Sequence, residues 1–128
     1  MPSREDAFRL RAFNFACDIV RLFQRLERRL PGTIARQILR SGTSIGANLE
    51  EAKAAQSRSD LRSKFSIALK EARETSYWLR LVVASALVQP EDVKNETQEA
   101  HEFVAMLTAS VRSLRNGSRD RVARSPKT

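Results

Sequence analysis

The chain has very few of the side chains on which catalysis and metal binding depend. Its 128 residues include one cysteine, Cys17, and one histidine, His101, and these fall in different predicted helices. Nucleophile–base pairs and metal sites need such groups close together. The run Gln98-x-x-His101 comes nearest to a di-iron motif, but it lacks the required glutamate. We therefore predict no catalytic residue, no metal site and no cofactor, and we expect a protein that is not an enzyme.

A single cysteine also excludes an internal disulfide, which fits a reducing compartment. No apolar run approaches the roughly 20 residues that a membrane-spanning helix needs. No apolar signal core follows the first residues of the chain. We expect a cytoplasmic protein without a membrane partner.

Glycine and proline are scarce as well, with four of each, which is too few for a turn-rich β fold. Hydrophobic residues recur at helical spacing in four segments, separated by three short breaks. Short connections force neighbouring helices to run antiparallel. We predict an all-α, antiparallel, up-down-up-down four-helix bundle over residues 1–116, with helices at about 6–29, 33–56, 59–88 and 90–115.

The breaks between these segments carry recognisable start and stop signals. Pro31 and Gly32 end the first segment, and Ser57 with Asp60 fits a capping box before the third. Pro90 suits the first turn of the fourth helix. The pair Asn116-Gly117 is a good helix stop, so we predict that the basic tail, residues 117–128, is disordered.

The centre of the second segment contains two glycines, Gly42 and Gly46, four residues apart on one helical face. A glycine inside a helix costs about 1 kcal/mol relative to alanine. Either the helix breaks here, or a close neighbour requires small residues. The shared face favours the second interpretation.

The net charge of +8 favours a polyanionic partner, with nucleic acid first and acidic protein or lipid surfaces behind it. Three predicted helices carry basic stripes, and Tyr77 adds a ring that can stack on an unpaired base. The alternative is that these are ordinary solvated faces. The candidate nucleic-acid-binding residues are Arg21, Arg25, Arg28, Arg36, Arg40, Lys53, Arg62, Lys70, Arg73, Tyr77 and Arg80.

Trp78 and Phe103 flank the hydrophobic seams of their helices and do not lie on them. Bulky residues beside a seam either complete the core of the bundle or bury against another copy of the chain. The sequence leaves both alternatives open, and we count Trp78 among the candidate interface residues.

Two stretches resemble the bacterial four helix bundle protein family, also called the 23S rRNA intervening-sequence protein family. The first is residues 37–52, Gln-Ile-Leu-Arg-Ser-Gly-Thr-Ser-Ile-Gly-Ala-Asn-Leu-Glu-Glu-Ala. The second is residues 65–79, Phe-Ser-Ile-Ala-Leu-Lys-Glu-Ala-Arg-Glu-Thr-Ser-Tyr-Trp-Leu. The similarity covers about residues 8–115. Its most specific element, Ser44-Ile45-x-x-Asn48, lies in the middle of a helix.

The resemblance implies a four-helix bundle that assembles into a ring-shaped homopentamer. A related branch, the accessory protein of diversity-generating retroelements, is a basic pentamer that binds nucleic acid and a reverse transcriptase. The resemblance also marks Gly42, Ser44, Ile45, Gly46 and Asn48 as structural or interface residues, with Asn48 expected to bond to a neighbouring helix or subunit. Two functions follow as expectations, an oligomeric nucleic-acid-binding protein and a scaffold for an acidic protein partner such as a reverse transcriptase.

Overall fold

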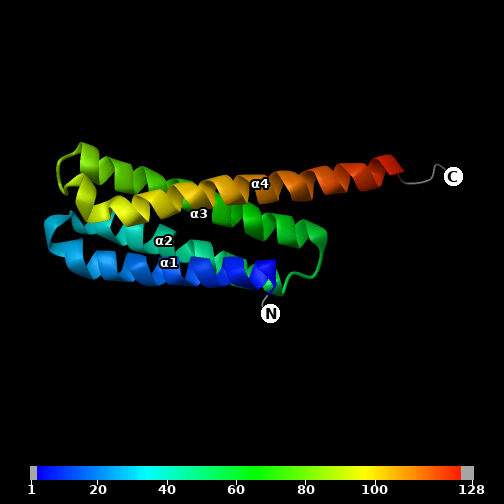
Figure 1. Ribbon diagram of the computed structural model, residues 1–128, viewed down its shortest axis with the longest axis horizontal. Helices are drawn as coiled ribbons and strands as arrows, with labels where there is room; N and C mark the ends of the chain where they lie inside the picture. Colours follow the sequence, from blue (N-terminus) through cyan, green and yellow to red (C-terminus); the bar gives the residue numbers. More distant parts are fainter. Residues whose placement is uncertain (1–2, 125–128) are drawn as a thin grey trace.

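The computed structural model describes the backbone of residues 3–124 and the side chains of residues 3–117, and over this range the chain is a four-helix bundle without strands (Figure 1). Consecutive helices run antiparallel, as the short connections predicted. The chain forms α1 (Arg4–Leu26), the 3₁₀ turn η1 (Glu27–Arg29), α2 (Gly32–Lys53), α3 (Arg58–Ala84), the 3₁₀ turn η2 (Pro90–Val93) and α4 (Lys94–Arg124).

Serine caps begin two of these helices. The Ser3 hydroxyl accepts the Asp6 N–H at 3.0 Å and the Asp6 carboxylate accepts the Ser3 N–H, which completes a capping box at α1. The predicted box at α3 forms only in part. Ser57 accepts the Asp60 N–H, but the Asp60 carboxylate accepts the N–H of Gln56 instead of that of Ser57.

The end of α3 corrects one predicted boundary. The helix stops at Ala84 and does not reach residue 88, because Ala86 adopts a left-handed backbone with φ of 60°. The N–H of Leu87 then bonds the Val82 carbonyl and the N–H of Ala86 bonds the Val83 carbonyl, the pattern of a Schellman cap. Similar adjustments shorten two other helices, with η1 replacing the last turn of α1 and α2 ending at Lys53.

The predicted stop at Asn116-Gly117 is wrong. Helix α4 continues through both residues to Arg124, and its end extends past the other three helices (Figure 1). Gly117 lies where the guanidinium of Arg58 occupies the space that a β-carbon would take. The glycine therefore makes room for a side chain from α3 and does not terminate the helix. Of the predicted tail, residues 125–128 lie outside the described residues.

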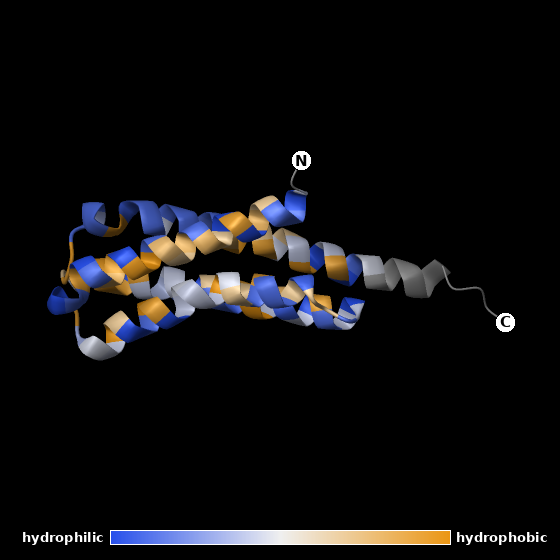
Figure 2. Ribbon diagram, turned by 90° about the horizontal axis from the view of Figure 1, so that it is seen from below, coloured by the Kyte–Doolittle hydropathy of each residue, from blue (hydrophilic) through white to orange (hydrophobic). Residues whose placement is uncertain are grey.

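Hydrophobic and hydrophilic residues alternate along every helix (Figure 2), and the core follows the predicted seams closely. Phe103 is an exception, since it flanks the seam in the sequence yet is fully buried. Its ring lies 5.7 Å from that of Phe8 and 5.5 Å from that of Phe15, so it fills the space between α1 and α4. Of the two alternatives for this residue, completion of the core is the one observed.

The two central glycines of α2 face α1, and the helix does not break. A β-carbon at Gly42 would lie 2.7 Å from Cγ1 of Ile19, and one at Gly46 would lie 3.3 Å from the carbonyl oxygen of Ala12. Small residues are therefore needed here for α1 and α2 to approach closely.

Candidate nucleic-acid interface

The solvent-facing side of α3 carries the most coherent basic stripe among the described residues. Lys70, Arg73, Tyr77 and Arg80 follow one another at spacings of three, four and three residues, and all four are exposed. We call these four residues the α3 outer face. Arg80 lies over the Tyr77 ring, with 5.9 Å between the guanidinium carbon and the ring centroid, and Trp78 meets the same ring edge-on at 5.2 Å.

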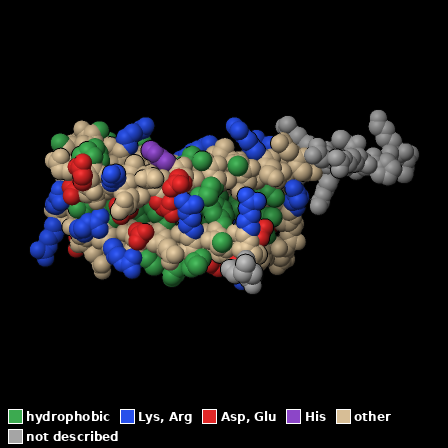
Figure 3. All heavy atoms as spheres, viewed as in Figure 1, with side chains coloured by type: hydrophobic (Ala, Val, Ile, Leu, Met, Phe, Trp, Pro, Cys, Tyr) green, Lys and Arg blue, Asp and Glu red, His purple; other side chains and the backbone are tan. Residues whose placement is uncertain are grey.

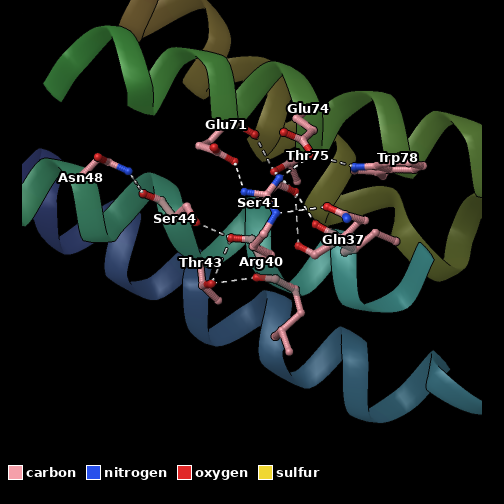
Figure 4. A network of polar contacts seen from close by, with 12 residues as sticks. Gln37, Arg40, Ser41, Thr43, Ser44, Asn48, Glu71, Glu74, Thr75 and Trp78 are labelled. Carbon is pink, nitrogen blue, oxygen red and sulfur yellow. Dashed lines mark hydrogen bonds and ion pairs between the residues drawn. The ribbon is translucent and has the colours of Figure 1, made fainter. Parts of the chain in front are cut away.

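Both glutamates of α3 pair with Arg40 of α2, and Glu74 also lies close enough to Lys70 to interact with its charge. Glu71 is 7 % exposed, and its carboxylate accepts Arg40 Nη1 of α2 at 3.1 Å. Glu74 accepts Arg40 Nη2, and it also accepts the indole N–H of Trp78 at 3.2 Å (Figure 4). Helix α3 is therefore sorted by charge, with its glutamates toward α2 and its cations toward solvent.

Arg40 of α2 pairs with both glutamates of α3. Its guanidinium lowers the pKa of the Glu74 carboxyl, chiefly by hydrogen bonding to it, and the same contact raises the pKa of Arg40. A guanidinium held by two carboxylates presents little net positive charge to a ligand. Arg40 was predicted as a nucleic-acid-binding residue, and the structure instead gives it a part in joining α2 to α3.

Hydroxyl groups extend the contact between α2 and α3 into the core of the bundle. The buried Thr75 hydroxyl donates to Ser41 Oγ at 2.9 Å, and Ser41 Oγ donates to the Gln37 carbonyl at 2.8 Å. Every polar atom of this chain of hydroxyls thus has a partner, as burial requires. The family-like stretch of α2 is in this respect a helix-packing motif.

The most specific part of that stretch satisfies its hydrogen bonds within α2. Ile45 is fully buried, and Ser44 Oγ donates to the Arg40 carbonyl. The Asn48 side-chain amide donates to the Ser44 carbonyl at 2.8 Å. Of the predicted partners of Asn48, the neighbouring helix is not the one observed, because the acceptor one turn earlier in its own helix lies within reach. A bond to a neighbouring subunit stays a prediction.

The predicted stripe on α1 is largely neutralised by ion pairs. Arg21 pairs with Asp18 at 3.2 Å, and Arg25 donates to the Asp92 backbone carbonyl at 3.0 Å while lying 4.0 Å from Glu96. Arg28 is exposed, and no ion-pair partner for it occurs among the residues described. Two of these three arginines thus serve contacts within the chain.

The remaining candidates do not join the α3 outer face into one patch. Arg36 and Lys53 are exposed near opposite ends of α2, and Arg62 is half-buried on α3. Lys and Arg side chains are spread along the length of the bundle, with acidic groups among them (Figure 3). The α3 outer face is therefore the one predicted stripe that the structure brings together without acidic residues of its own helix.

Sequence reasoning missed one surface altogether. Leu10 and Phe13 on α1 are 60 % and 59 % exposed, and Val20 is 41 % exposed, on the side of α1 opposite its buried residues. With Cys17, which is half-buried, they form a line at spacings of three, four and three residues. We call these four residues the α1 ridge. Its heptad spacing was available in the sequence, but the stronger core seam of the same helix masked it.

Groups for other chemistry are not assembled. No cluster of three or more His, Cys, Asp or Glu residues suited to a metal ion occurs in the described part of the chain. His101 is exposed on α4. Within the same range, none of the helices combines the length and the apolar character that crossing a membrane would require.

The sequence model of the 23S rRNA-intervening sequence protein family matches residues 7–109. The chain belongs to this family. Among solved structures, one similar protein is a protein of unknown function from the S23 ribosomal protein family of Bacteroides thetaiotaomicron. It is 40 % identical, the match covers 80 % of this chain and 96 % of that one, and the TM-score is 0.75. Among curated proteins, none matches. The family and fold expected from residues 37–52 are thus confirmed.

Proposed function

We propose that this member of the 23S rRNA-intervening sequence protein family is a non-enzymatic, basic accessory protein of the cytoplasm that binds RNA or DNA. The observation that carries the proposal is the charge sorting of α3. Arg40 holds Glu71 and Glu74 on one side of the helix, and three cations and Tyr77 occupy the other.

This arrangement suits a phosphate backbone. Arg73 and Arg80 can each hold a phosphate bidentately, and Lys70 adds a compact positive charge one turn away. The exposed ring of Tyr77 offers a stacking surface for an unpaired base. The sequence contains no recognisable groove-reading motif, so we expect binding with low sequence specificity.

We propose further that five copies form a ring, as the family resemblance implies. Exposed hydrophobic side chains on the α1 ridge support an assembled state, because such side chains rarely line one face of a monomer. Light scattering after gel filtration is expected to give about five times the 14.5 kDa chain mass.

Binding is tested with a fluorescent RNA and a fluorescent DNA of mixed sequence, titrated by anisotropy at several salt concentrations between 50 and about 200 mM. We expect affinity to fall steeply with salt, since counterion release drives this kind of binding. The double variant K70A/R73A should bind more weakly, and its salt slope should be smaller by about 0.7–0.9 for each phosphate that it no longer neutralises.

The control is Arg112→Ala, an exposed arginine on α4 away from the α3 outer face. It removes a positive charge from the same protein and should leave the slope nearly unchanged. A loss in Arg112→Ala about half as large as that in K70A/R73A would indicate binding by overall charge alone. Absence of binding at 50 mM salt would contradict the proposal and leave the acidic protein partner, for which a pull-down that survives nuclease treatment is the readout.

A further inference from the structure

A second apolar surface lies on another side of the molecule from the α1 ridge. It is an open groove of about 700 Å³ between the end of α3 and the start of α4. We call it the α3–α4 groove. Its floor is apolar, formed by residues such as Leu79, Val83, Val93 and Ala105, and its charged lining residues are Arg80, Lys94 and Glu102.

The ridge and the groove lie at the same height along the bundle. Helices α1 and α4 are antiparallel neighbours, and Arg11 near the start of the ridge pairs with Glu99 at 2.6 Å and Glu102 at 3.2 Å. Beyond the other end of the ridge, Arg25 contacts Glu96 and the Asp92 carbonyl. The ridge therefore spans the same length of the bundle as residues 93–105 of α4, which line the groove.

Symmetry and shape favour a ridge-to-groove contact over a ridge-to-ridge contact. Ridge against ridge joins the same surface of two copies, so it would end at a dimer and could not build the five-membered ring proposed above. A line of protruding apolar side chains also fits an apolar hollow better than another such line.

We infer that the α1 ridge of one copy packs into the α3–α4 groove of the next copy. Such a contact joins two different surfaces, so it propagates from copy to copy and ends only when a ring closes. Equal height of the two surfaces means that successive copies need no displacement along the bundle axis, and a ring forms instead of a filament. We call this contact the joint. It rests on the assembly proposed above and adds the two surfaces that form it.

The arrangement leaves Lys70, Arg73 and Tyr77 exposed on α3, beside the joint but outside it. Arg80 belongs to both surfaces, since it lines the groove and ends the α3 outer face.

The native cysteine of the ridge makes a direct test. Cys17 is the only cysteine in the chain, and Ala84 and Ala105 are exposed on the two walls of the groove. A disulfide requires α-carbons about 4.4–6.8 Å apart, so only cysteines that face each other across the joint will react. After mild oxidation, A84C or A105C should give a ladder of covalent oligomers on a non-reducing gel. The controls C17S/A84C and C17S/A105C should give none, and neither should S66C, which lies far from the groove on α3.

The outcomes of the oxidation experiment distinguish a ridge-to-groove contact from a ridge-to-ridge contact. A ladder from either groove variant, abolished by removing Cys17, supports the inference. A Cys17–Cys17 dimer in the unsubstituted protein would show ridge against ridge and overturn it. So would the absence of a ladder from both variants while light scattering still shows an oligomer. A monomer by light scattering would instead mean that the proposed assembly itself fails.

A second variant tests the role of the α1 ridge in assembly without cysteine chemistry. Phe13→Asp replaces a side chain that is 59 % exposed in the single chain, so helix content and thermal unfolding of the isolated copy should change little. We expect a shift from oligomer to monomer, and we expect Ser63→Asp, an equal charge change on neither surface, to stay assembled. An assembled Phe13→Asp protein would overturn the inference.

Discussion

Cγ1 of Ile19 lies 2.7 Å from the position that a β-carbon at Gly42 would occupy. This pair sets how closely α1 and α2 approach. Ile19 is fully buried, so its branched side chain has no open space into which it can turn.

Gly42→Ala is therefore expected to destabilise the bundle by about 1 kcal/mol. Overpacking costs about 1–3 kcal/mol, and the better helix propensity of alanine returns about 1 kcal/mol. The measurement is urea unfolding followed by circular dichroism. In the double variant I19A/G42A the added methyl group enters the space vacated by Ile19, so the two changes should be less than additive. Strict additivity would contradict this account.

The same substitution at Gly117 is expected to have the opposite sign. The group nearest the added β-carbon is the guanidinium of Arg58, at the end of a long side chain that can move aside. The gain in helix propensity should then prevail, raising the free energy of unfolding by about 0.5–1 kcal/mol. A loss of stability in Gly117→Ala would mean that the position of Arg58 is fixed.

Ala86→Gly is expected to stabilise the protein by about 0.5–1 kcal/mol. Ala86 holds φ at 60°, which strains an L-residue by about 1–2 kcal/mol, and glycine removes that strain at some entropic cost in the unfolded chain. Ala109→Gly, at an exposed helical position of α4, is the matched control and should destabilise by about 1 kcal/mol. A similar loss in both variants would contradict the prediction.

Arg40→Ala is expected to lower the free energy of unfolding by about 1–3 kcal/mol at pH 7, because it leaves Glu71 buried without its cation. The effect should depend on pH. Arg40 holds the pKa of Glu74 below its ordinary value, so this contribution is fully present above the unfolded-state pKa of about 4.3. It disappears as pH falls through the lower folded-state pKa. Unfolding curves of the two proteins should therefore converge in acid.

The control for this experiment is Arg36→Ala, which removes an exposed arginine one turn earlier on α2. It should change stability little at any pH, as most surface substitutions do. A pH-independent difference between Arg40→Ala and the unsubstituted protein would show that packing of the arginine stem, and not charge, is what matters.

The sequence predicted the number, order and direction of the helices because each has a long run of apolar residues at helical spacing. Their ends were harder to predict. The left-handed conformation of Ala86, which ends α3, has no sequence signature. Gly117 has the signature of a helix stop, but α4 continues through it and the residue lies against the side chain of Arg58. Local signals compete with packing most strongly where helices end.

The candidate site was predicted in part for a related reason. Helical spacing placed Lys70, Arg73, Tyr77 and Arg80 on one exposed face, as observed, whereas Arg62, predicted for the same face, is half-buried. Helical spacing gave no information on which arginines pair with acidic residues of other helices. Arg25 and Arg40 form such pairs. Ion pairs between helices depend on the rotation of each helix in the bundle, which a single-helix pattern does not define.

Arg40 lies behind the α3 outer face, yet it influences the electric field in front of it. While it offsets one of the two negative charges of Glu71 and Glu74, an approaching polyanion meets mainly the attraction of the cations beyond. Losing Arg40 would leave both carboxylates without their cation, and so add one net negative charge, within about one Debye length of those cations, roughly 8 Å at physiological salt. Under the proposed function, association with nucleic acid should then be slower although none of the proposed contact residues has changed, because long-range attraction sets the rate of encounter.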